Sequence, residues 1–179
     1  MKTLLHVCCA PCANQCIDVL RGDHYEVTGY WYNPNIHPFT EYRARRNCLR
    51  EYAQTIELPL IERNDYGLRP FVRAVADDIE HRCVKCYEFR LGEAARQAAE
   101  GGFDSFTSSL FISPYQQHEL MREVAERAAK EYGVEFLYEH GTVIPVLRNV
   151  SEALLNVYTE KLSAAGSMVE RGTAGSNNM

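Results

Sequence analysis

Short apolar segments alternate with longer amphipathic segments along this chain. Five runs rich in apolar, β-branched or aromatic residues predict strands, at residues 3–7, 25–32, 58–61, 103–107 and 135–138. Between these runs the apolar residues recur with a period of about 3.6, which predicts helices at residues 13–22, 40–56, 70–76, 87–100 and 116–132. Weaker patterns predict a further strand at 143–147 and a further helix at 151–165.

The order of these elements predicts the fold class. Strands separated by helices indicate βα units, and hence an α/β fold with a parallel sheet flanked by helices. In such a sheet, ligands bind at the carboxyl ends of the strands. Three polar segments directly follow predicted strands: Cys8-Cys9, Asn33-Pro34-Asn35 and residues 108–115. We therefore expect these three segments to meet at one edge of the sheet and to form the active site.

Five of the seven cysteines form two clusters, Cys8-Cys9-Ala10-Pro11-Cys12 and Cys83-Val84-Lys85-Cys86. The C-x-x-C spacing lets two thiolates converge on one soft metal ion or one iron–sulfur cluster. Thiolates favour zinc, Cu(I) or iron–sulfur centres over magnesium or calcium, and the spacing leaves open which of these is bound. Cys16 and Cys48 stand among helix-forming residues, where we expect small buried apolar side chains.

Composition indicates one globular unit. With 179 residues, of which 46% are apolar, we expect a single α/β metal-binding domain over residues 1–165 and a disordered Gly/Ser/Asn-rich tail over residues 166–179. The sequence has neither an apolar run that could span a bilayer nor a secretory signal pattern, so we expect a cytoplasmic protein with reduced cysteines and no membrane partner.

Charge adds one local feature. The formal net charge of −5 does not by itself indicate nucleic-acid binding. Arg43, Arg46 and Arg50, however, have the spacing of one helix face, which is either a solvated face or a surface that contacts phosphate. No P-loop and no G-x-G-x-x-G pattern occurs, which disfavours a phosphate-cradling nucleotide site after the first strand.

Four motifs in order resemble the QueH-type epoxyqueuosine reductases. They are HVCCAPC at residues 6–12, YNPNIHP at 32–38 followed by Glu41-Tyr42-Arg43, RCVKCYEFRL at 82–91, and SLFISPYQ at 109–116. The resemblance, which covers residues 3–138, implies a Rossmann-like sheet related to the adenine-nucleotide α-hydrolases (HUP-like), with the nucleotide loop replaced by a cysteine loop. It implies the last step of queuosine biosynthesis: two-electron reduction of epoxyqueuosine in the wobble position of tRNA, yielding queuosine and water.

The same resemblance implies a cofactor and partners. The family carries a 4Fe-4S cluster, and its ligand positions fall on Cys8, Cys9, Cys83 and Cys86 in this sequence. Cys12 stands where the family has another potential ligand, for an adjacent mononuclear iron. The implied partners are a tRNA carrying epoxyqueuosine and an electron donor.

Removal of the epoxide oxygen also needs a proton source. His37, Tyr115 or a water molecule are the candidates, although His37 has the alternative role of bonding the backbone of its turn. Asn33 and Asn35 form that turn, and we assign them to the wall of the substrate pocket.

Basic residues are the candidates for tRNA contacts. Arg43 and Arg46 are assigned to this role, together with Arg82 and Arg90, which flank the second cysteine pair. At that position the positive charge of Arg82 and Arg90 would contact tRNA phosphate, stabilise an anionic thiolate cluster, or serve in ordinary ion pairs.

The C-terminal part departs from the family pattern. The family usually ends in a Tyr-Cys-Gly-Cys segment, in which the C-x-C pair acts as a redox-active disulfide, whereas residues 157–167 here contain no cysteine. This leaves three alternatives: an altered C-terminus, a variant in which electrons pass directly to the cluster, and a paralogue without reductase activity. The competing function is a non-catalytic iron–sulfur or zinc protein that binds RNA or serves a structural role.

Overall fold

A parallel five-stranded sheet forms the centre of the molecule. The computed structural model describes residues 1–138, so the predicted strand at 143–147, helix at 151–165 and tail at 166–179 lie outside the described residues. The strands are ordered β3-β2-β1-β4-β5 across the sheet, and every neighbouring pair is parallel. Their bounds are β1 Lys2–His6, β2 Glu26–Trp31, β3 Leu60–Glu62, β4 Ser105–Ser108 and β5 Glu135–Phe136.

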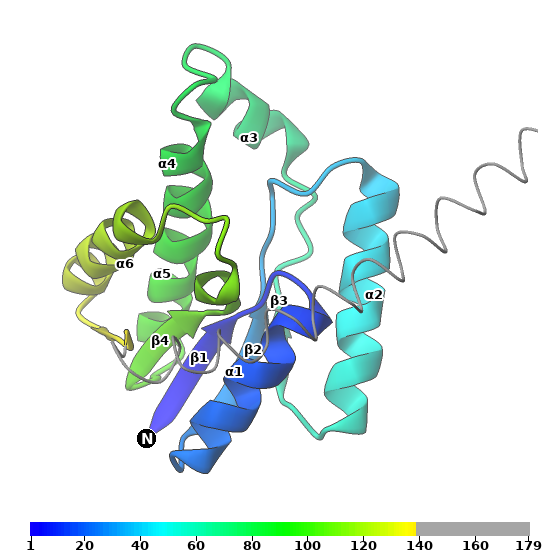
Figure 1. The fold of residues 1–179 in the computed structure, drawn as a ribbon, viewed down its shortest axis with the longest axis vertical. Helices are drawn as coiled ribbons and strands as arrows, with labels where there is room; N and C mark the ends of the chain where they lie inside the picture. Colours follow the sequence, from blue (N-terminus) through cyan, green and yellow to red (C-terminus); the bar gives the residue numbers. More distant parts are fainter. Residues whose placement is uncertain (139–179) are drawn as a thin grey trace, which may run out of the picture.

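Helices cover both faces of this sheet (Figure 1). They are α1 Ala10–Gly22, α2 Phe39–Thr55, α3 Leu68–Val75, α4 Arg82–Tyr87, the π-helical turn η1 Glu88–Gly92, α5 Glu93–Glu100, the 3-10 turn η2 Ser109–Ile112 and α6 His118–Tyr132. Helices α1 and α2 lie on one side of the sheet, and α4, α5 and α6 on the other. The predicted α/β fold with a parallel sheet is therefore confirmed.

Two apolar clusters hold the layers together. Neighbouring residues of a strand point to opposite faces, so Leu4 packs in the cluster with α5 and α6, whereas Leu5 packs in the cluster with α1 and α2. Trp31, at the end of β2, is fully buried in the second cluster and donates a hydrogen bond from its indole Nε1 to the Tyr42 hydroxyl at 3.2 Å.

The strand order β3-β2-β1-β4-β5 is that of the first five strands of a doubly wound Rossmann sheet. The closer relation to adenine-nucleotide α-hydrolases stays a prediction, as does a single domain ending at residue 165. Within residues 1–138, no helix is both long enough and apolar enough to cross a bilayer.

The helix boundaries differ from the predicted ones where cysteines or prolines occur. Helix α1 begins at Ala10 instead of residue 13, because Pro11 fits the first helical turn. Helix α2 begins at Phe39, directly after Pro38 and one residue before the predicted start at residue 40. The segment from Arg82 to Glu100 is helical throughout, so Cys83 and Cys86 lie within a helix and not before one.

Candidate metal centre

Three loops meet at the carboxyl edge of the sheet, as the sequence predicts. His6 at the end of β1 is in register with Tyr30 of β2 and Ser108 of β4, so the three strands end side by side. The Asn33 side-chain amide then donates to the Val7 carbonyl at 2.9 Å. These bonds fix the loops relative to one another.

A buried polar network lies beneath this edge. His6 Nε2 lies 3.1 Å from the Tyr32 carbonyl, which can only accept, so Nε2 carries the proton. Its Nδ1 therefore accepts from the Ser108 hydroxyl at 2.8 Å, and Ser108 Oγ accepts from the Leu110 N–H at 3.2 Å. Burial, with a smaller effect of the Arg90 charge, lowers the pKa of His6 to about 3 and keeps its ring neutral. In the sequence, the signal for His6 is a polar residue in an otherwise apolar predicted strand.

Cys8, Cys9 and Cys12 form a compact group. Their sulfur atoms all lie within 4.8 Å of one another, with 3.9 Å between Cys8 and Cys9 and 3.0 Å between Cys9 and Cys12. Cys9 immediately precedes α1 and Cys12 lies in its first turn, so the helix start determines the spacing. The Cys8 N–H donates to Ser109 Oγ at 3.2 Å, and the Ser109 hydroxyl lies 3.5 Å from Cys8 Sγ.

The three thiols are electrostatically coupled. Hydrogen bonds from Cys12 and Cys9 hold the pKa of Cys8 well below its usual range, and the Arg90 charge adds to this effect. A hydrogen bond with Cys12 favours ionisation of Cys9, but the neighbouring Cys8 thiolate and burial outweigh it and raise the pKa of Cys9 to about 12. A negative charge on one sulfur of the group is thus stabilised by hydrogen bonds from the others.

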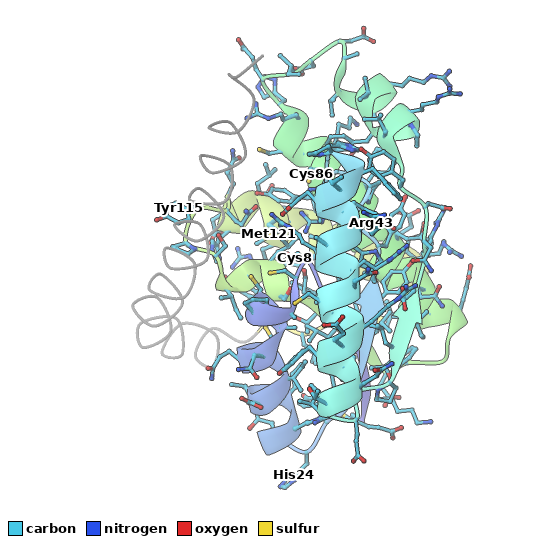
Figure 2. All side chains as sticks on the ribbon, turned by 90° about the vertical axis from the view of Figure 1, so that its right-hand side faces the viewer. Cys8, His24, Arg43, Cys86, Tyr115 and Met121 are labelled. Carbon is cyan, nitrogen blue, oxygen red and sulfur yellow. The ribbon has the colours of Figure 1, made fainter. Side chains whose placement is uncertain are left out.

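The second pair, Cys83 and Cys86, lies on α4, and Figure 2 shows Cys86 above Cys8 in its view. Cys83 packs against the same apolar cluster as Cys8, and Cys86 Sγ accepts a hydrogen bond from Arg90 at 3.6 Å. Neither Cys83 nor Cys86 belongs to the compact group of three sulfurs. The described residues thus offer a group of three thiols with two more on the adjacent helix, and soft donors of this kind fit a soft metal ion or an iron–sulfur cluster.

Comparison with known proteins identifies the family. The sequence model of the family described as epoxyqueuosine reductase QueH matches residues 3–150. The chain belongs to the QueH family. The predicted family is thereby confirmed, and the match includes both cysteine clusters of this QueH-family chain.

Individual relatives share much of this QueH-family sequence. An epoxyqueuosine reductase QueH of Dehalococcoides mccartyi is 40% identical over 137 residues, which cover 76% of this chain and 75% of the relative. Those of Histophilus somni and Haemophilus influenzae are each 36% identical over 135 residues, or 73% of this chain, but only 56% and 55% of their own length is covered. The chain thus spans about half the length of these two relatives. Residues 157–167, which lack the C-x-C pair, lie beyond the matched region and outside the described residues.

The two predicted proton donors occupy different environments. The His37 ring packs edge-on against Tyr66, with ring centroids 5.0 Å apart, and both ring nitrogens are shielded from solvent. Burial lowers the pKa of His37, an effect that the nearby Pro34 backbone partly offsets. Tyr115 is 83% exposed, and Figure 2 shows Tyr115 and Arg43 on opposite sides of Cys8.

The predicted pocket asparagines both lie in the loop after β2. Asn33 is fully buried, and its Oδ1 has no hydrogen-bond partner among residues 1–138. Asn35 is half-buried, and its Oδ1 likewise has none there.

Of the four arginines predicted to contact tRNA, two are exposed and two contact other side chains of the protein. Arg43 on α2 and Arg82 on α4 are exposed, and Arg82 donates to the Ile79 carbonyl at 3.1 Å. Arg46 stacks on the Tyr42 ring at 5.8 Å and bonds Asn64. Arg90 is buried beside Cys86 and so lies too deep for a phosphate contact.

The remaining two cysteines are not equivalent. Cys16 is half-buried and packs against the cluster beneath α1 and α2, which agrees with a small apolar role. Cys48 is exposed, so its predicted burial is wrong. The buried stripe of α2 contains Leu49, and the preceding position is rotated by about 100° from it toward solvent.

Proposed function

We propose that this QueH-family chain is an iron–sulfur oxidoreductase that reduces epoxyqueuosine to queuosine in the wobble position of tRNA. The observation that carries the proposal is the group of cysteine thiols at the carboxyl edge of a parallel sheet, in a chain whose relatives are epoxyqueuosine reductases. That edge is where α/β sheets bind their ligands.

The proposed ligands of a 4Fe-4S cluster are Cys8, Cys9, Cys83 and Cys86, with Cys12 available for an adjacent iron. Their thiolates supply the donor set that such clusters use, and the bound cluster would supply the electrons for epoxide reduction. The buried network of His6 and Ser108 holds the loop that carries Cys8.

The residues of the protein itself have two further proposed roles. His37 or Tyr115 would provide the proton for the departing oxygen. Asn33 and Asn35 would line the substrate pocket, because each has an amide oxygen without a partner among residues 1–138 that is available to a ligand hydroxyl.

Exposed arginines offer a surface for tRNA. Arg43 follows Phe39 by one turn on α2, and Phe39 is 47% exposed. Arg69 and Arg73 are exposed on α3, which borders the site because Phe71 lies between His37 and Phe89. Arginines that contact phosphates, with an aromatic ring on which a base can stack, are typical of single-stranded RNA recognition. An anticodon loop is RNA of this kind.

Purification without oxygen tests the cofactor. We expect brown protein containing iron, with a broad visible absorption band that dithionite bleaches. Cys83→Ser should lose the iron and the band, whereas the matched variant Cys48→Ser, changed at an exposed cysteine, should keep both. A colourless protein with one zinc ion per chain would overturn the iron–sulfur assignment in favour of a structural zinc site.

The activity is tested on tRNA that carries epoxyqueuosine. Protein reduced with dithionite is incubated with this tRNA, and the nucleosides are separated after digestion. We expect queuosine to form. An absence of queuosine from protein with full cluster occupancy would contradict the reductase function.

A further inference from the structure

Arg90 is a buried arginine that has no carboxylate partner among residues 1–138. It is 5% exposed, and among residues 1–138 its hydrogen bonding consists of one bond from Nη1 to Cys86 Sγ at 3.6 Å. Its Nε is buried and has no acceptor there. A guanidinium is a permanent positive charge in proteins, and an unpaired buried charge is costly. An anion close to Arg90 is therefore needed in the working protein.

The groups nearest to Arg90 identify this anion. Cys86 Sγ is bonded to Arg90 directly, and Cys83 of the same pair packs against the same apolar cluster as Cys8. Arg90 thus contacts a sulfur of the second cysteine pair. A charge on a centre held by these cysteines would compensate Arg90, which forms no ion pair with a carboxylate among residues 1–138.

The backbone turn that carries Arg90 is unusual. Residues Glu88–Gly92 form a π-helical turn between α4 and α5, and such turns occur frequently at functional sites. Arg90 follows Cys86 by four residues, which places both on one side of the helical stretch. Its neighbour Leu91 is fully buried in the apolar cluster. The turn therefore presents a cation to the cysteines without interrupting the core.

We propose that Arg90 is a positioning residue that serves as the fixed counter-charge of the metal centre. It stabilises the reduced form, which carries one more electron and hence one more negative charge, and so raises the reduction potential. The guanidinium itself gains and loses neither a proton nor an electron. The inference rests on the proposed function, because it requires a redox-active centre on these cysteines.

Redox titration of iron-loaded protein tests this role. In Arg90→Gln, the ratio of reduced to oxidised centre at a fixed applied potential should fall about tenfold, a shift of about 59 mV to more negative potential for a one-electron couple. Arg90→Lys should recover most of the shift, and Arg127→Gln on the neighbouring α6 should show none. An unchanged potential in iron-loaded Arg90→Gln would overturn the proposal.

A second measurement applies if Arg90→Gln does not retain iron. Without metal, Arg90→Met should raise the melting temperature, because it removes an uncompensated buried charge and keeps an apolar stem. The same variant should lose iron to a chelator faster than the wild type. A lower melting temperature of metal-free Arg90→Met would mean that Arg90 serves only the fold, and would overturn the proposal. Failure of the proposed function would instead appear in the wild type, as absence of iron or of queuosine.

Discussion

Arg90 and Glu93 lie within one helical turn of each other, yet their charges are compensated in different ways. Glu93 accepts ion pairs from Arg63 and Arg96, each at 2.6 Å, and a hydrogen bond from the Tyr30 hydroxyl at 3.2 Å. Burial alone would raise the pKa of Glu93, but hydrogen bonds from Arg96 and Arg63 outweigh it and lower the pKa. This network is complete within the described residues.

Among residues 1–138, the hydrogen-bond acceptor of Arg90 is the sulfur of Cys86. The same residues pair Arg63 and Arg96 with a carboxylate, but they provide none for Arg90. The comparison teaches that the Glu93 network serves the fold, whereas the uncompensated charge of Arg90 marks the part of the molecule prepared for a ligand.

The largest expected effect is on metal content. It should appear when a cysteine of the compact group is changed, but not when Glu93 is changed. Cys8→Ser removes one of the three sulfurs of the compact group, so we expect iron per chain to fall at least about tenfold. Glu93→Ala should leave iron per chain at the wild-type value. Elemental analysis of both proteins, purified without oxygen, measures this difference. Equal iron loss in the two variants would show that the cysteine group and the Glu93 network are not separate functional and structural regions.

The next effect is on stability. Glu93→Ala should lower the free energy of unfolding by about 2 kcal/mol, because it leaves two arginines and the Tyr30 hydroxyl without their shared partner. Urea unfolding of the metal-free proteins measures the change. Glu119→Ala on α6, whose side chain is 72% exposed, is the matched control and should cost about 0.5 kcal/mol or less beyond its change in helix propensity.

A smaller effect depends on pH. The pKa of Glu93 is lower in the folded protein than in the unfolded chain. Its ion pairs therefore contribute stability above its ordinary pKa, and this contribution is lost as the pH falls through the folded value. The stability difference between wild type and Glu93→Gln should thus narrow on acidification, by roughly 1 kcal/mol because the arginines are partly exposed. A difference that stays constant in urea titrations from pH 6 down to the lowest pH at which the protein remains folded would contradict this account.

The smallest expected effect concerns the surface. Arg127 pairs with Glu88 at 2.9 Å, but its side chain is 60% exposed. Arg127→Gln should change the free energy of unfolding by about 0.5 kcal/mol or less. A loss above about 1 kcal/mol would indicate that the ion pairs around η1 act as one network, and that Arg90 and Glu93 are not independent.

The order of strands and helices could be read from the sequence because each element has its own apolar pattern. The meeting of the three loops followed from topology alone, since the carboxyl ends of parallel strands share one edge. The positions of Cys8 and Cys9 could be predicted from the end of β1 alone, because both residues follow that strand within three positions. Cys12 shows the limit, because its place in a helix depends on Pro11 starting that helix early.

The environments of single polar side chains could not be read in the same way. Arg82 and Arg90 both flank the second cysteine pair, yet one is exposed and the other buried, and the π-helical turn that contains Arg90 has no signature in the residue pattern. The partners of buried His6 are Tyr32, directly after β2, and Ser108 at the end of β4. Such long-range contacts are decided by three-dimensional packing, which a local sequence pattern does not contain.

Trp31 gives the molecule a built-in optical reporter. It is the single tryptophan of the 179 residues, and it is fully buried at the end of β2, on the edge of the sheet that carries the cysteines. Iron–sulfur chromophores absorb at the wavelengths where indole emits. Binding of such a centre at the cysteines should therefore quench the fluorescence of Trp31 by energy transfer. Loading and release of the centre can then be followed in real time, by fluorescence and without a label.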